Sequence, residues 1–200
     1  MSPAQPHPIR GVVFDLDGTL TVPAIDFAAM RADIGVPEGD VLGALKRMPG
    51  GERRRAEQAI ERREQAAAAN STLSDGARDL LDFIAAERIK TGIVTRNSRT
   101  SVETFSRKHG ITFDAVITRD DAPPKPSPEP LTAALERMGV GPHEAIFIGD
   151  FEIDRLAGEA AGIPTYIVRN HPDVRDSGPP EMRVACLRDI ITIIKEADAR

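Results

Sequence analysis

The sequence predicts an α/β protein with a doubly wound parallel sheet. Three observations support this fold class. Short apolar runs rich in Val, Ile and Phe recur along the chain, and segments with helical periodicity separate them. The runs lack the apolar–polar alternation of a half-exposed sheet, so both faces of the predicted sheet are expected to be covered. Right-handed crossovers between parallel strands then place helices on both faces.

The first predicted strand covers residues 10–14 and ends on two carboxylates, Asp15 and Asp17, which Gly18 and Thr19 follow. In an open α/β sheet, ligands bind at the carboxyl ends of the strands. The local interpretation is therefore a metal-bound, carboxylate-based active site. The alternative is an Asp-rich turn, since Asp and Gly are common in turns.

Residues 21–70 are predicted to be helical, with helices over 26–34, 38–47 and 52–69. Asp26 is the expected N-cap of the first, and Gly35 and Pro37 end it. The third has a narrow apolar stripe formed by Ala56, Ala59, Ile60, the stem of Arg63 and Ala67. A crossover needs only about a dozen residues, so this insert is predicted to be a separate helical lobe suited to act as a lid. The predicted division is a core of residues 1–20 and 71–200 and a helical cap of residues 21–70.

Beyond the insert, strands and helices alternate. Residues 1–9, rich in proline, are predicted to be a loose tail, and the stretch past Asn170 is predicted to be a polar loop with a short apolar piece at 183–187. The predicted strands are 91–95, 115–118, 145–148 and 165–168. The predicted helices are 77–87, with an apolar face that includes Ala85, then 100–109, 131–138, 153–161 and 189–197.

Composition narrows the class of protein. The 200 residues suffice for one buried domain, or for one domain with a small lobe, and 40% of them are hydrophobic. The net charge of −5, from 31 acidic and 26 basic residues, argues against a nucleic-acid binder. No apolar run suits a membrane span or a signal peptide, and the one cysteine, Cys186, excludes an internal disulfide. We expect a cytoplasmic protein that does not act on membranes.

Polar residues follow four of the predicted strands. Asp15 and Asp17 follow the first, Thr95 the second, Lys125 the third, and Asp150 with Asp154 the fourth. Taken singly, Thr95 could be a helix cap, Lys125 a solvated loop residue, and Asp154 an acid that favours a helix N-terminus. The parallel fold would bring all of them to one sheet edge. Four carboxylates against one lysine carry a formal charge of about −3, which calls for a cation, and such oxygen ligands favour Mg²⁺.

The order of these residues resembles the four motifs of the haloacid dehalogenase (HAD) superfamily, most of whose members are Mg-dependent phosphatases. Asp15-Leu16-Asp17-Gly18-Thr19 resembles motif I, Val94-Thr95 motif II, Lys125-Pro126 motif III, and Gly149 to Asp154 motif IV. The resemblance spans about residues 10–168 and implies a Rossmann-like core. The insert resembles the C1-type cap of phosphoglycolate-phosphatase-like members but is short. Motif II differs, because Arg96 precedes Asn97 where many relatives have Asn directly.

The resemblance implies a role for each residue. Asp15 would attack phosphorus and form an aspartyl-phosphate, and Asp17 would be the general acid and then the base. Thr95, Arg96, Asn97 and Lys125 would bind the phosphoryl group. Asp15, Asp17 and Asp150 would ligate Mg²⁺, with Asp154 acting from outside the ligand set.

Other functions remain open at this stage. A dehalogenase has no task for Asp17 or Asp150, a sugar phosphomutase shares nearly the same core, and a catalytically silent binding protein would be expected to lack one of these residues. The substrate is expected to be a small phosphate monoester, with phosphoglycolate as a family-level possibility. Lys46 and Arg47 could reach a substrate carboxylate or be a solvated helix end. We expect a monomer or a weak homodimer.

Overall fold

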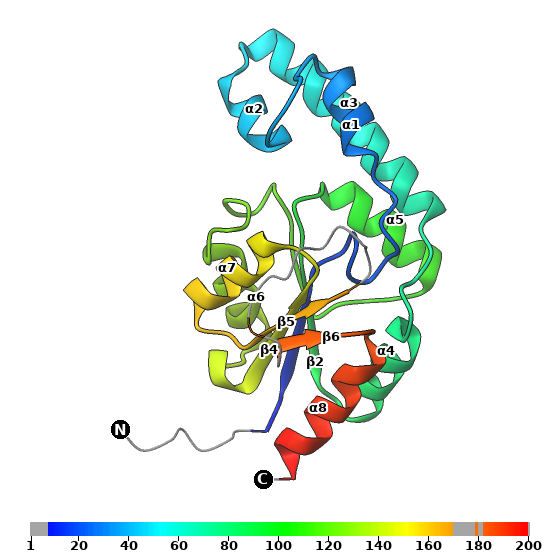
Figure 1. Ribbon diagram of the computed structural model, residues 1–200, viewed down its shortest axis with the longest axis vertical. Helices are drawn as coiled ribbons and strands as arrows, with labels where there is room; N and C mark the ends of the chain where they lie inside the picture. Colours follow the sequence, from blue (N-terminus) through cyan, green and yellow to red (C-terminus); the bar gives the residue numbers. More distant parts are fainter. Residues whose placement is uncertain (1–7, 170–178, 180–181, 200) are drawn as a thin grey trace. The chain divides into compact units, whose positions relative to one another are not determined.

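The protein is built on a six-stranded parallel sheet, seen in the computed structural model in Figure 1. The structure describes residues 8–169, 179 and 182–199. The strand order is β3-β2-β1-β4-β5-β6, and every neighbouring pair is parallel. The strands are β1 (Gly11–Phe14), β2 (Lys90–Val94), β3 (Ala115–Ile117), β4 (Ala145–Gly149), β5 (Thr165–Val168) and β6 (Arg183–Val184).

Helices cover both faces of this sheet. Helix α6 packs on β1, β2 and β3 and contacts α7, which packs on β4 and β5, while α4 contacts β2 and α8 from the other side (Figure 1). The helices are α1 (Phe27–Asp33), α2 (Val41–Arg47), α3 (Gly50–Asn70), α4 (Ala77–Ala86), α5 (Arg99–His109), α6 (Glu129–Met138), α7 (Glu152–Ala161) and α8 (Arg188–Asp198). The predicted doubly wound α/β fold is therefore confirmed.

Strand β1 is central, and its burial explains its apolar sequence. Val12, Val13 and Phe14 are fully buried, because β1 has neighbours on both sides and helices on both faces. Phe14 lies opposite Ile93 of β2 and Ile148 of β4, so these three strands end at the same edge of the sheet. The residues that follow them are consequently brought together there.

Two compact units make up the chain. One contains the sheet and comprises residues 1–23, 72–96 and 112–200, and the other comprises residues 24–71 and 97–111. The second unit is helical, containing α1, α2, α3 and α5. Its own core is formed by Met30, Ile34, Val41, Leu45, Ala56, Ala59 and Ile60. The division predicted from the sequence, with a cap of residues 21–70, stays a prediction.

Most predicted elements are present within one or two residues of the expected positions. Helix α1 has the predicted cap, since the Asp26 side chain accepts the backbone N–H of Ala29. The prediction of a helix from residue 38 was wrong at its start, because Asp40 caps α2 by accepting the N–H of Gly43. The short apolar piece at 183–187 contains strand β6, which was not predicted.

Two predicted apolar faces were partly wrong. In α3 the structure buries Glu64 and Ala68, whereas Arg63 and Ala67 are only half-buried. In α4, Ala85 is exposed, although the other predicted members of that face are buried. The predicted tail falls mostly on residues 1–7, and the predicted polar loop falls on 170–181. Apart from residue 179, both lie outside the described residues.

Candidate active site

The carboxyl edge of the sheet gathers the polar residues that follow β1, β2 and β4. Asp15 donates its backbone N–H to the carbonyl oxygen of Ile148, at 2.9 Å, and Thr95 donates to that of Ile117, at 3.0 Å. The parallel ladder thus extends one residue beyond each strand. Asp15, Thr95 and Asp150 are all buried there.

Lys125 is the cation at the centre of this edge. It is only 3% exposed, and its Nζ lies 2.5 Å from Asp15 Oδ1 and 2.6 Å from Asp154 Oδ1. The Phe147 ring lies beneath the ammonium group, with its centroid 5.5 Å from Nζ. Burial alone would lower the pKa of Lys125, but the charges of Asp15 and Asp154 outweigh it and raise that pKa. Lys125 is therefore a fixed positive charge.

Three buried carboxylates surround this lysine. Asp15, Asp150 and Asp154 each offer an oxygen within 4.8 Å of the others. Burial raises the pKa of Asp15 to about 6 and, together with the charges of Asp15 and Asp154, the pKa of Asp150 to about 8. One lysine cannot balance three carboxylates when all are ionised. An all-oxygen donor set with this excess negative charge fits a hard divalent cation such as Mg²⁺.

Residues of the turn after β1 hold Asp150 in place. The Thr19 hydroxyl donates to Asp150 Oδ1 at 3.3 Å. Gly18 has a positive φ of 86°, and a Cβ at this position would lie 2.1 Å from Asp150 Oδ2. Neither role was predicted from the sequence. The position of Gly18 and Thr19 directly after Asp17 was the only sequence signal for these roles. Their partner, Asp150, lies more than 130 residues away in the chain.

Asp154 supports the strand end that carries Asp150. Its Oδ2 accepts the backbone N–H groups of Phe151, at 3.0 Å, and of Asp150, at 3.3 Å. Gly149 makes room for it, because a Cβ there would lie 2.3 Å from the Asp154 Cβ. The carboxylate thus contacts both Lys125 and the backbone of the loop. Its predicted place outside the metal ligand set stays a prediction.

Asp17 lies outside the group of three mutually close carboxylates that the described residues contain. It is half-buried in a turn in which the N–H of Gly18 donates to the carbonyl of Thr21, at 3.0 Å. The Thr21 hydroxyl closes the same turn on the carbonyl of Leu16. These hydrogen bonds fix the backbone of the turn that carries Asp17. Its predicted roles as acid, base and metal ligand stay predictions.

The segment after Thr95 spans both compact units. Arg96 is half-buried in the first, and its carbonyl accepts a hydrogen bond from Arg119 Nη1 at 3.3 Å. Asn97 is buried in the second. Lys46 and Arg47 are exposed at the end of α2, also in the second unit. Phosphate binding by Arg96 and Asn97, and any substrate contact of Lys46 or Arg47, stay predictions.

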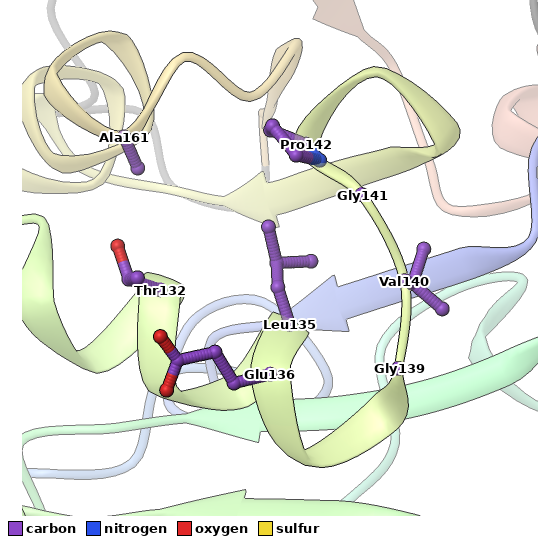
Figure 2. Close-up of a pocket in the computed structure, with 8 residues that line it drawn as sticks. All are labelled: Thr132, Leu135, Glu136, Gly139, Val140, Gly141, Pro142 and Ala161. Atoms are coloured by element: carbon purple, nitrogen blue, oxygen red, sulfur yellow. The ribbon is translucent and has the colours of Figure 1, made fainter.

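A cavity of about 330 Å³ lies elsewhere on the sheet unit (Figure 2). It runs along the end of α6 and the following turn to Ala161, and no residue of the carboxylate cluster lines it. The lining residues are Thr132, Leu135, Glu136, Gly139, Val140, Gly141, Pro142 and Ala161. The candidate site is thus the polar sheet edge and not this cavity.

The chain is similar to several known hydrolases. A haloacid dehalogenase-like hydrolase domain-containing protein of Arabidopsis thaliana is 32% identical, covering 90% of this chain and 78% of its own. An N-acetylmuramic acid 6-phosphate phosphatase of Pseudomonas aeruginosa is 30% identical, covering 82% of this chain and 85% of its own. The crystal structure of a HAD-superfamily hydrolase, subfamily IA, variant 1, from Geobacter sulfurreducens matches with a TM-score of 0.64 and 27% identity, covering 93% of this chain and 96% of the other.

None of the helices in the described part of the chain has the length and apolar character needed to cross a membrane.

The family is shown by a match that includes all four motifs. The family model described as "haloacid dehalogenase-like hydrolase" matches residues 9–162, which contain every candidate site residue. This chain belongs to the haloacid dehalogenase-like hydrolase family.

Proposed function

We propose that this protein is a Mg²⁺-dependent phosphatase that hydrolyses a small phosphate monoester through an aspartyl-phosphate on Asp15. One observation carries the proposal: Asp15, Asp150 and Asp154 are buried together around Lys125. The family is one of hydrolases, and the relative from Pseudomonas aeruginosa is a sugar phosphate phosphatase by name. Burying three carboxylates is costly unless positive charge offsets them, and Lys125 supplies only one such charge.

Mg²⁺ would be held by Asp15, Asp17 and Asp150, and when bound it would offset the negative charge that carboxylates and phosphate bring together. Asp150 is prepared for this task by Thr19, which donates a hydrogen bond to Oδ1, and by Gly18, which leaves room for Oδ2. The raised pKa of Asp150, about 8, reflects the cost of ionising this carboxyl group without a cation. A divalent ion would remove that cost.

In the first step, an Asp15 carboxylate oxygen attacks phosphorus, and the bond to the leaving oxygen breaks. The electron pair goes to that oxygen, which takes a proton from Asp17. Lys125, whose Nζ lies 2.5 Å from Asp15 Oδ1, holds the nucleophile in place and offsets charge on the phosphoryl group. Thr95, Arg96 and Asn97 bind phosphoryl oxygens in this proposal.

In the second step, Asp17, now ionised, takes a proton from water. The water oxygen attacks phosphorus, and the bond between phosphorus and Asp15 breaks. Orthophosphate leaves, and Asp15 returns as a carboxylate. This division into two displacements is the usual benefit of nucleophilic catalysis by a carboxylate.

The substrate class rests on chemistry common to the family and on its cap. We infer a small phosphate monoester, and phosphoglycolate is one member of that class. We also infer that residues 21–70 form the cap over a core of residues 1–20 and 71–200. We expect a cytoplasmic protein. We also expect a monomer or a weak homodimer, and size-exclusion chromatography of the purified protein tests this oligomeric state.

A phosphatase assay over a panel of phosphorylated metabolites, run with and without EDTA, tests the function. Release of orthophosphate that stops with EDTA and returns with Mg²⁺ supports the proposal. Hydrolysis that is undiminished in EDTA removes the role of the metal. Conversion of a sugar phosphate to its isomer, dependent on trace bisphosphate, would identify a phosphomutase instead.

A further inference from the structure

Glu64 is a charged residue of α3 whose carboxylate is buried. Helix α3 exposes most of its charged side chains, yet Glu64 is only 4% exposed. Its Oε2 accepts the backbone N–H of Ser98, with 3.1 Å between oxygen and nitrogen. Both residues belong to the helical unit, in which α3 packs against α5 (Figure 1).

The position of the acceptor group explains why a carboxylate is tolerated there. Ser98 is the N-cap of α5, and its hydroxyl accepts the N–H of Ser101. Glu64 accepts the backbone N–H of Ser98 at the positive end of the α5 dipole, which favours a negative charge there. A buried carboxylate is costly unless it is hydrogen-bonded in this way. The contact is therefore specific for an acceptor and would not be made by an apolar side chain.

Ser98 ends the segment to which phosphate binding is assigned. Thr95, three residues earlier, is fixed at the sheet edge by its N–H, which donates to the carbonyl of Ile117. Arg96 and Asn97 lie between these two anchors. Thr95 is thus fixed within the sheet unit, and Ser98 is held by Glu64 within the helical unit.

The same two helices are also joined at their carboxyl ends. Ser71 Oγ lies 2.8 Å from the His109 ring nitrogen Nε2, and Lys108 Nζ donates to the carbonyl of Ala69 at 2.9 Å. These contacts connect the ends of α3 and α5 whatever occupies position 64. A change at Glu64 should therefore loosen the beginning of α5 without separating the helices.

We propose that Glu64 is a positioning residue for the reaction, which holds the phosphate-binding segment 95–98 through the backbone N–H of Ser98. This inference rests on the proposed function, because it assigns Glu64 a task in phosphate binding. Glu64 touches neither substrate nor metal in this role. Within the helical unit, it binds the last helix of the predicted cap to Ser98, the N-cap of α5.

The test compares Glu64→Met with Glu64→Gln. Methionine has a similar length but accepts no comparable hydrogen bond, whereas glutamine keeps a carbonyl acceptor. The assay measures KM and kcat for nitrophenyl phosphate with Mg²⁺, and the inhibition constant of inorganic phosphate. Melting temperatures of all variants are recorded alongside.

Glu64→Met is expected to raise both KM and the inhibition constant of phosphate about three- to tenfold, less than the loss of a direct charge-assisted hydrogen bond to phosphate, because the binding segment is only loosened. The kcat should change little, because the segment that Glu64 positions is proposed to bind the phosphoryl group alike in substrate and transition state. Glu64→Gln should recover most of the phosphate affinity. Glu57→Ala, which removes a 40% exposed carboxylate two turns earlier in α3, is the matched control and should behave as wild type.

A purely structural residue would give a different pattern, in which the melting temperature changes and the phosphate inhibition constant does not. That pattern in folded Glu64→Met overturns the inference. Should this variant fail to fold, Glu64→Asp decides, because it keeps the charge but withdraws the acceptor by one methylene group. Unchanged phosphate affinity in folded Glu64→Asp likewise overturns it. Wild-type protein that neither hydrolyses esters nor binds phosphate would refute the proposed function, and the role of Glu64 with it.

Discussion

Gly18 and Asp150 approach each other so closely that no side chain fits between them. A Cβ at position 18 would lie 2.1 Å from Asp150 Oδ2, and the φ of 86° at Gly18 already disfavours other residues. The two residues come from different strand ends, β1 and β4. The position of the Asp150 carboxylate therefore requires a glycine at residue 18.

Gly18→Ala is expected to weaken Mg²⁺ binding, because the new methyl group must displace the Asp150 carboxylate. We expect the Mg²⁺ concentration for half-maximal activity to rise by about 10- to 100-fold, the usual range when the support of a metal ligand is lost. Gly35→Ala is the matched control, since Gly35 has a φ of 69° and open space around its Cβ position. Both variants should lose about 1–2 kcal/mol of stability from backbone strain. An equal loss of Mg²⁺ affinity in both would show that strain alone is responsible.

Asp15→Asn should abolish turnover while leaving the protein folded, because it removes the nucleophile and hardly changes the volume. Steady-state assays of ester hydrolysis and a thermal melt measure the two effects. Residual activity above about one part in a hundred would be hard to reconcile with a covalent route through Asp15, given the rate advantage expected of such catalysis.

Asp17→Asn should separate the two proton transfers assigned to this residue. An alkyl phosphate needs an acid in the first step, whereas nitrophenol leaves readily as an anion. Steady-state turnover should fall on both substrates by about 10²- to 10⁴-fold, since hydrolysis of the intermediate needs the base. In rapid mixing, the aryl substrate alone should retain a burst of nitrophenol approaching one per site. Equal slowing with no burst from either would assign Asp17 a merely structural part.

The pH dependence of stability should reveal the carboxylate cluster. Burial raises the pKa of Asp15 from 3.8 to about 6 and that of Asp150 from 3.8 to about 8. A raised carboxyl pKa favours the folded state below about pH 4, and this contribution is lost as the pH rises through the folded-state values. The EDTA-treated protein should therefore melt progressively lower, relative to Asp150→Asn, as the pH rises from 5 to about 8.5.

Mg²⁺ should counteract this loss, because it binds the ionised carboxylates. The rise in melting temperature on adding Mg²⁺ should be larger near pH 8 than near pH 5 for the wild-type protein, and small for Asp150→Asn. Calorimetric melts at the two pH values measure it. A Mg²⁺ effect that is the same at both would mean that the cluster does not titrate in this range.

The parts of the fold that depend on local sequence were predictable. Strand β5 (Thr165–Val168) and the end of α5 at Gly110 agree with their predictions, because an apolar run and a left-handed glycine are local signals. Strand β6 was missed, since two residues give no periodicity. The buried face of α3 was misplaced for a related reason: its run of alanines from 66 to 69 is equally apolar on every side, so tertiary packing alone selects Ala68.

In the candidate site, too, some features could be predicted from the sequence and others could not. The positions of Asp15, Thr95 and Asp150 at strand ends followed from the expectation of parallel strands, and the structure places all three at one edge. The contacts of Gly18 with Asp150 and of Glu64 with Ser98 could not be predicted. Each joins residues far apart in the chain, and the residue types alone, a turn glycine and a helical glutamate, suggest ordinary local roles.

The central place of β1 has a consequence for the order in which the protein is made. Its neighbours, β2 and β4, are encoded far downstream, so β1 is synthesised long before either partner exists. A nascent chain in which β4 has not yet been made carries the apolar β1 and Asp15 but not Asp150, and such unpaired strands are prone to aggregation. The carboxylate cluster therefore cannot be completed until β4 and the loop that carries Asp150 and Asp154 have been translated.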